Sequence, residues 1–310
     1  MRVGLMFPPG ADPGEIPAAA RRAEAAGFDF FGCGEHVFFH GPVTNAFVGL
    51  AAAAGATERI RLLSALTVLP VYPAALAAKL IATLAAVSHG RFELGVGVGG
   101  EYPPEFTAVG VPPAERGRRA DEALEVLSRL LTGKPVTFRG EFTTLEEVTL
   151  QPVPAERPPV WVGGRRPAAM RRAARHGDVW LPYLVTPQRL AGSLAEVRAL
   201  AAGNGRAPDS VRGGVFCWST VDADGDWARR AVVEAVSETY QQDFSRYADS
   251  YLLHGTPARV RERLAEYADA GAEHLVFAPA CPEADRDRVV DTFAAEVLPF
   301  LGERKVTRAH

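Results

Sequence analysis

Short apolar runs rich in β-branched residues alternate along the chain with longer segments in which apolar residues recur at helical spacing. The runs that predict strands cover residues 3–7, 28–33, 60–65, 92–98, 160–162, 179–181, 211–217 and 274–278. The segments that predict helices cover residues 15–26, 45–56, 74–87, 114–131, 168–175, 187–201, 226–253, 257–270 and 285–298. A strand that is followed each time by a helix is typical of βα units and a parallel sheet.

Eight such units within 310 residues predict a (β/α)8 TIM barrel, with a doubly wound sheet as the alternative. No linker or shift in composition divides the chain, so we expect one domain over residues 1–310. Residues 135–154 resemble a hairpin or an extended excursion. The helical stretch 226–253 exceeds a normal βα connection, which predicts an insertion after strand seven that could cover the barrel mouth as a lid.

Composition excludes several classes of protein. The chain is 47% hydrophobic and 23% charged, with a net charge of −3, whereas a nucleic-acid-binding domain is usually strongly basic. The three cysteines lie far apart and none forms a CxxC pair, which fits a reducing cytoplasm. The apolar run at residues 1–7 is too short for a signal peptide, and the uncharged stretch 62–78 is broken by Pro70 and Pro73, so we expect no membrane span.

In a barrel the active site forms where the strands end at their carboxyl termini. The segments that follow the predicted strands are rich in polar, glycine and aromatic residues, as a ligand site requires. They include Glu35 and His36, Ala65 and Leu66, Gly97, Gly99 and Glu101, Gly163, Gly164 and Arg165, Tyr183, and Trp218. From position alone, Phe7, Tyr183, Trp218 and residues 247–251 are expected to line a substrate pocket.

Two glycine-rich segments suggest different ligands. Residues 95–100 match GxGxxG, but Pro103 and Pro104 follow and are expected to prevent the helix that a dinucleotide site requires, so glycines for close approach are the favoured interpretation. The segment from Gly163 to Arg166 precedes a predicted helix, where backbone N–H groups and arginines favour phosphate. A glycine turn with solvated arginines explains it equally well.

His36 can act as a general acid or base near neutral pH, or can merely satisfy backbone groups at the rim. His36 and His40 have helical spacing for a metal, but the residues around them do not look helical, so we predict no metal site. Glu101 and Glu105 follow strand four, and either is a candidate acid or a solvated loop residue. One arginine of the set Arg116, Arg118 and Arg119 could reach an anionic ligand. No GxSxG, HExxH or Walker sequence is present.

Four stretches together resemble the bacterial luciferase-like monooxygenase superfamily, whose members use reduced FMN or the deazaflavin coenzyme F420. These stretches are residues 23–29 with Glu35-His36, residues 82–99, residues 105–117 and residues 255–276. The resemblance covers nearly the whole chain. It implies a (β/α)8 barrel, in agreement with the strand count.

The resemblance also implies roles for particular residues. Glu35 and His36 match an acidic residue and a histidine that flank the cofactor ring. A non-proline cis peptide is implied near Ala65–Leu66, behind the ring, and phosphate contacts at Gly163, Gly164 and Arg165. The nearest match to a proton-donating glutamate is Glu101, although Gly100 looks like an inserted residue. The further cofactor-binding residues that we predict are Gly97, Gly99 and Tyr183.

The pair Glu35-His36 departs from the Asp-His of many deazaflavin members. Glu-His occurs in luciferase itself, and with the following Val37 it also resembles one deazaflavin subgroup, which favours F420. We therefore expect an F420-dependent oxidoreductase that transfers a hydride between the deazaflavin and a small organic substrate. The alternatives are an FMN-dependent monooxygenase that uses O2, and a barrel that only binds flavin. The second and third helices are rich in alanine and could form a homodimer face. The sequence does not identify the substrate.

Overall fold

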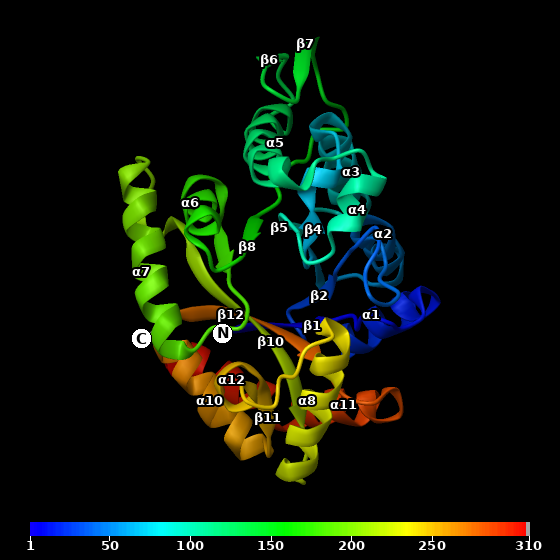
Figure 1. The fold of residues 1–310 in the computed structure, drawn as a ribbon, viewed down its shortest axis with the longest axis vertical. Helices are drawn as coiled ribbons and strands as arrows, with labels where there is room; N and C mark the ends of the chain where they lie inside the picture. The colour runs from blue at the N-terminus through cyan, green and yellow to red at the C-terminus, as the bar shows by residue number, and fades with distance from the viewer. Residues whose placement is uncertain (308–310) are drawn as a thin grey trace.

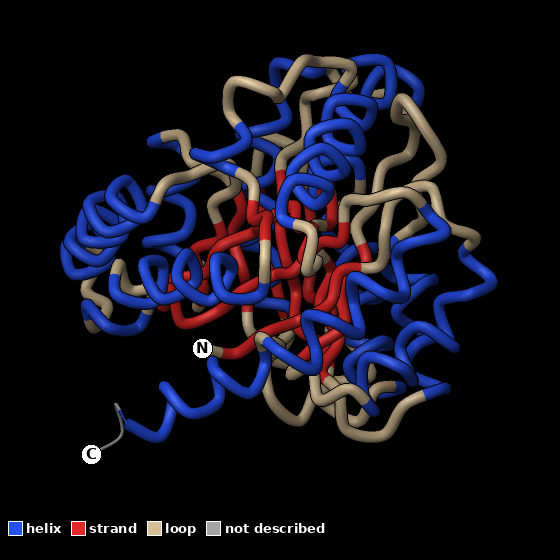
Figure 2. Tube along the Cα trace, turned by 90° about the horizontal axis from the view of Figure 1, so that it is seen from below, coloured by secondary structure: helices blue, strands red, loops and turns tan. Residues whose placement is uncertain are grey.

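Eight parallel strands close into a barrel in the computed structural model, which describes residues 1–307 (Figures 1 and 2). In chain order they are β1 (Arg2–Met6), β2 (Phe30–Cys33), β3 (Arg61–Ser64), β5 (Phe92–Gly97), β8 (Val160–Gly163), β9 (Val179–Leu181), β10 (Arg212–Val221) and β12 (Ala272–Pro279). Each strand pairs with its neighbours in the order β1-β2-β3-β5-β8-β9, and the pairs β9–β10, β10–β12 and β12–β1 complete the circle. The predicted (β/α)8 fold is confirmed.

Helices surround the barrel (Figure 2), and apolar residues of these helices belong to the core that packs against its outer face. They are α1 (Ile16–Ala25), α2 (Ala46–Ala56), α3 (Ala74–Val87), α4 (Pro103–Ala108), α5 (Arg116–Leu130), α6 (Pro167–His176), α7 (Pro187–Gly203), α8 (Gly225–Tyr240), α9 (Ala248–Tyr251), α10 (Pro257–Asp269), α11 (Arg286–Glu296) and α12 (Leu298–Thr307). Side chains of Asn45, Thr186, Asp224 and Thr256 accept hydrogen bonds from the first turns of α2, α7, α8 and α10. These caps satisfy backbone donors that a helix start leaves free.

Large side chains fill the barrel interior. Phe30 points inward against Trp161, with ring centroids 5.3 Å apart, and Phe31 points outward to the helices, as the two-residue period of a strand requires. Glycine is needed at Gly4, because a Cβ there would lie 1.9 Å from the Phe30 ring. The interior is therefore packed around these rings, and a cavity opens toward the carboxyl ends of the strands.

The prediction for residues 226–253 was wrong in part. Helix α8 ends at Tyr240, where Gln241 takes a left-handed conformation with a φ of 52°, and the chain then forms α9 and a short strand, β11 (Leu253–Gly255). A second short strand, β4 (Thr67–Val68), also escaped prediction and pairs with β5. The predicted hairpin is present as β6 (Val136–Arg139) and β7 (Thr144–Val148), which project away from the barrel (Figure 1).

The expectation that Pro103 and Pro104 prevent a helix was also wrong, since α4 begins at Pro103. Proline is well tolerated in the first turn of a helix, because the N–H that it lacks would have no partner there. This short helix carries Glu105 and Phe106, both fully buried.

Candidate functional site

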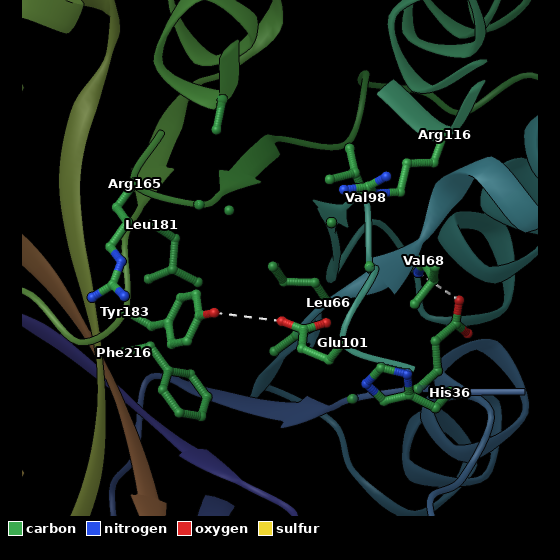
Figure 3. Close-up of a pocket in the computed structure, with 18 of the residues that line it drawn as sticks. His36, Leu66, Val68, Val98, Glu101, Arg116, Arg165, Leu181, Tyr183 and Phe216 are labelled. Carbon is green, nitrogen blue, oxygen red and sulfur yellow. Dashed lines mark hydrogen bonds between the residues drawn. The ribbon is translucent and has the colours of Figure 1, made fainter. Parts of the chain in front are cut away.

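A cavity of about 670 Å³ opens at the carboxyl ends of the barrel strands (Figure 3). Segments that follow β1, β2, β3, β5, β8, β9 and β10 all contribute to its wall. The predicted catalytic and cofactor-binding residues lie along it: Glu35, His36, Ala65, Leu66, Gly97, Gly99, Glu101, Gly163, Gly164, Arg165 and Tyr183. The barrel thus brings together residues that are far apart in the chain.

His36 is held by a carboxylate that the sequence singled out only as one of two loop glutamates. Its Nδ1 lies 3.0 Å from Oε2 of Glu105, a residue with no solvent exposure. The same oxygen accepts a hydrogen bond from the Val37 backbone N–H at 3.2 Å. The Phe39 ring stacks on the imidazole at 4.3 Å between centroids. Because a carboxylate accepts hydrogen bonds, Nδ1 carries the shared hydrogen and Nε2 is left for a ligand.

The side chain of Glu35 hydrogen-bonds to neighbouring segments of the protein rather than offering its carboxylate to a ligand. Its carboxylate is 5% exposed and accepts hydrogen bonds from Val68 N (2.9 Å), Ala46 N (3.2 Å), Asn45 Nδ2 (3.2 Å) and Tyr72 Oη (3.0 Å). Burial raises the pKa of Glu35 above its ordinary value, while these hydrogen bonds act in the opposite direction. The residue ties the β4 segment to the start of α2, which is a positioning role.

Leu66, Gly97 and Gly163 line one side of the cavity. The Ala65–Leu66 peptide bond is cis, as the resemblance implied. A Cβ on Gly163 would lie 2.1 Å from Cδ1 of Leu66, and a Cβ on Gly95 would lie 1.9 Å from the Ser64 carbonyl oxygen. Glycine is required at both positions, because any side chain would displace Leu66 or the β3 backbone. We call this surface the glycine face; Gly97, Gly163 and Leu66 form it, and Gly95 packs behind it against β3.

One end of the cavity contains Arg116 and Arg165, and a hydrogen-bond donor there has no partner among residues 1–307. Arg116 begins α5, and its Nε is buried without a hydrogen-bond partner, although Nη1 donates to the Pro113 carbonyl at 2.7 Å. Gly164 and Arg165 lie where β8 leads into the N-terminus of α6. Helix N-termini and arginines both favour anions, so this end suits a phosphate. Of the three arginines noted in the sequence, Arg118 and Arg119 pair instead with Glu141 and Glu115.

One hydrogen bond crosses the cavity. Tyr183 Oη donates to Oε1 of Glu101 at 3.4 Å, joining the segment after β9 to the segment after β5 (Figure 3). Burial, followed by the nearby Glu101 carboxylate, raises the pKa of Tyr183 above its ordinary value. Glu101 is exposed, so its carboxylate can also meet a ligand in the cavity.

Two expectations for the pocket wall were wrong. Phe7 packs in the outer core against Phe31, with centroids 6.2 Å apart, and it is Met6 that lines the cavity. Tyr247 and Tyr251 pack on each other at 6.2 Å, and neither lines the cavity. Trp218 and Tyr183 do line it. Successive residues of an extended chain point to opposite sides, so Met6 faces the cavity and Phe7 faces the outer core.

Within residues 1–307, no group of three or more His, Cys, Asp or Glu side chains is arranged to hold a metal ion. None of the helices in that range combines the length and apolar character that a membrane-spanning helix needs.

The chain is similar to known proteins in sequence and in structure. The family model for luciferase-like monooxygenases matches residues 1–274. An uncharacterized protein of Mycobacterium tuberculosis is 38% identical over 168 residues, which cover 54% of this chain and 58% of that protein. The chain thus aligns with little more than half of that relative's length.

Two further relatives align over most of their length. The F420-dependent glucose-6-phosphate dehydrogenase of Microbacterium testaceum is 28% identical, over 94% of each chain. The FMNH(2)-dependent dimethylsulfone monooxygenase of Pseudomonas fluorescens is 29% identical, over 92% of this chain and 86% of that one.

Solved structures share the fold. The monooxygenase RslO1 of Streptomyces bottropensis superposes with a TM-score of 0.85 at 26% identity, over 96% of this chain and 99% of that one. An F420-dependent secondary alcohol dehydrogenase superposes with a TM-score of 0.86 at 22% identity, over 96% and 98% of the two chains.

Proposed function

Because the chain belongs to the luciferase-like monooxygenase family, we propose that it is an F420-dependent oxidoreductase that transfers a hydride between the deazaflavin and a small organic substrate. The observation that carries this proposal is the pairing of His36 with buried Glu105 beside the glycine face. The F420-dependent relatives that align over most of their length support it.

The residues present fit a cofactor with fused rings and a phosphate, which describes both F420 and FMN. The glycine face offers a surface without side chains at Gly97 and Gly163, against which flat rings can lie. At the other end, the unpartnered Nε of Arg116 and the α6 N-terminus would hold the phosphate, with Gly164 and Arg165 beside it. When bound, such a cofactor supplies the two-electron chemistry, and the protein supplies position and proton transfer.

His36 manages the proton that accompanies hydride transfer. Oxidation of an alcohol removes a hydride from carbon and a proton from oxygen, and reduction of a carbonyl returns both. His36 Nε2 takes or returns that proton, because Glu105 occupies Nδ1 and fixes the orientation of the ring. Glu101 is a second candidate for proton transfer on the β5 side of the cavity.

An FMN-dependent monooxygenase is the second candidate function, favoured by the 29% identity to the dimethylsulfone enzyme. Fluorescence titration of the purified protein with F420 and with FMN separates the two. We expect micromolar binding of F420, weakened about tenfold by Arg116→Met through loss of a charged donor. Micromolar binding of FMN without binding of F420 overturns the first candidate in favour of the second. Cofactor binding without turnover on any alcohol, carbonyl compound or sulfone supports a barrel that only binds flavin.

We further propose that residues 1–310 act as one domain in the cytoplasm and form a homodimer through α2 and α3. Helix α2 carries no charged residue, and Val48, Leu76 and Val87 on this face are 70%, 50% and 51% exposed. Covering these side chains would stabilise a dimer. Light scattering after size-exclusion chromatography tests this: we expect a dimer that Leu76→Asp converts to a monomer, and a monomeric parent protein would contradict it.

A further inference from the structure

We propose that the substrate is an uncharged, largely hydrophobic alcohol or carbonyl compound rather than a sugar phosphate. This inference rests on the function proposed above and concerns one part of the same cavity. That part, which we call the apolar compartment, is formed by Met6, Leu181, Tyr183, Phe216, Trp218 and Tyr240.

The apolar compartment is built from aromatic rings. Phe216 and Trp218 meet edge to face with centroids 5.1 Å apart, and Trp218 meets Tyr240 at 6.3 Å. None of its six side chains is charged. Aromatic and aliphatic walls of this kind favour apolar ligands, because they gain from removing apolar surface from water.

A cation, Arg165, does border the compartment. Its guanidinium lies 5.6 Å from the Tyr183 ring centroid, and its Nη1 donates to the Leu184 carbonyl at 2.6 Å. Arg165 lies beside the site proposed for the cofactor phosphate, so it is not available to a phosphate on the substrate. The cation therefore does not turn the compartment into an anion site.

Nearly all the hydrogen-bonding capacity of the compartment is already used. Trp218 Nε1 donates to Tyr240 Oη at 3.3 Å, and Tyr183 Oη donates to Glu101. Burial raises the pKa of Tyr240 above its ordinary value, so the hydroxyl keeps its proton and can donate it. A substrate with one carbonyl or hydroxyl oxygen matches this single donor. A sugar with many hydroxyls would leave most of them unpaired, which is costly in a buried site.

The helix that ends at the compartment also disfavours an anion. Thr239 and Tyr240 are the last residues of α8, so the helix presents its C-terminus, which carries partial negative charge. The Glu101 carboxylate, bonded to Tyr183, adds a full negative charge nearby. A phosphate is therefore favoured at Arg116 and the α6 N-terminus rather than at the C-terminus of α8.

Isothermal titration calorimetry with cyclohexanol and with glucose 6-phosphate tests the inference. Each is titrated into the protein alone and into the protein saturated with whichever of F420 and FMN it binds. We expect saturable binding of cyclohexanol and no binding of glucose 6-phosphate in the cofactor-saturated form. Phe216→Asp should weaken cyclohexanol binding at least about tenfold, since it places a charge in an apolar wall. The matched variant Val148→Asp, on the exposed β7 strand, should leave it unchanged.

Three results overturn the inference: binding of glucose 6-phosphate without cyclohexanol, absence of cyclohexanol binding in both forms, or cyclohexanol binding that Phe216→Asp does not weaken. Failure of the proposed function has a different signature. In that case FMN binds without F420, or neither binds, and the titrations of cyclohexanol, with the Phe216→Asp comparison, still decide the nature of the compartment.

Discussion

Nδ1 of His36 lies 3.0 Å from Oε2 of Glu105, although 69 residues separate the two in the chain. His36 follows β2, and Glu105 sits on the short helix α4 after β5. The carboxylate is fully buried and also binds the Val37 backbone N–H, so its position is fixed by two contacts. A fixed carboxylate orients the imidazole and determines which nitrogen carries the hydrogen.

Glu105→Gln should therefore lower turnover about 10- to 100-fold, because the amide no longer enforces the same orientation and protonation of His36. We expect kcat to fall while KM changes little, because the loss of orientation affects the reacting nitrogen rather than binding. Glu146→Gln, on the exposed hairpin, serves as the control. An unchanged kcat in Glu105→Gln would contradict the proposed pairing.

His36→Ala should lower turnover by about 10²-fold or more while leaving the affinity for the cofactor nearly unchanged, because the side chain moves a proton rather than holding the phosphate. Steady-state kinetics and cofactor titration together measure the two effects. His40→Ala is the matched control, since His40 contacts Tyr102 rather than Glu105. Equal turnover in His36→Ala and the parent protein would leave His36 a purely structural residue.

Glu35→Ala should act on stability first. Its removal leaves the backbone N–H groups of Val68 and Ala46 and the Tyr72 hydroxyl without their acceptor. Each unpaired buried group costs about 1–3 kcal/mol, so we expect the free energy of unfolding to fall by roughly 3 kcal/mol or more. Urea denaturation measures this, with exposed Glu58→Ala as the control. Full stability together with lost turnover would instead make Glu35 a catalytic residue.

His274 should make the fold sensitive to acid. It is 1% exposed, neither ring nitrogen has a hydrogen-bond partner, and burial, aided by Arg212 and Arg2, lowers its pKa from 6.5 to about 3. Between pH 6.5 and about pH 3, the His274 imidazole is protonated in the unfolded chain but stays neutral in the folded protein. The free energy of unfolding should therefore fall as the pH drops below 6.5, by at most about 1.4 kcal/mol per pH unit from this residue.

Urea denaturation from pH 7 to pH 4 measures this effect as a difference in slope. His274→Phe keeps a ring against Trp161, so its stability should depend less steeply on pH than that of the parent protein. The same comparison with exposed His89→Gln should show no difference from the parent. Parallel curves for His274→Phe and the parent would show that the buried ring does not titrate in this way.

The alternation of apolar runs and helical segments was sufficient to predict the barrel, because each strand and helix is specified by its own local pattern. The same reasoning failed near residue 241, where a left-handed residue ends α8 without a glycine to signal it. It also failed at Pro103, because a proline pair can begin a helix as well as prevent one.

Within the site, the strand-end rule located the cavity-lining residues, but it could not assign their partners. The role of Glu105 depends on the direction of α4, and the unpartnered Nε of Arg116 depends on how α5 packs behind Gly100. Both are tertiary relationships. Recognition of Pro103 as a helix start would have placed Glu105 beside buried Phe106 and suggested that it faces inward.

The Tyr183–Glu101 contact has a consequence for how ligands enter. It is one long hydrogen bond of 3.4 Å between side chains on two surface segments, and no strand of the barrel takes part in it. Breaking it requires only that these side chains change rotamer, which takes far less time than movement of a domain. The contact can therefore open and close while the barrel strands stay in place.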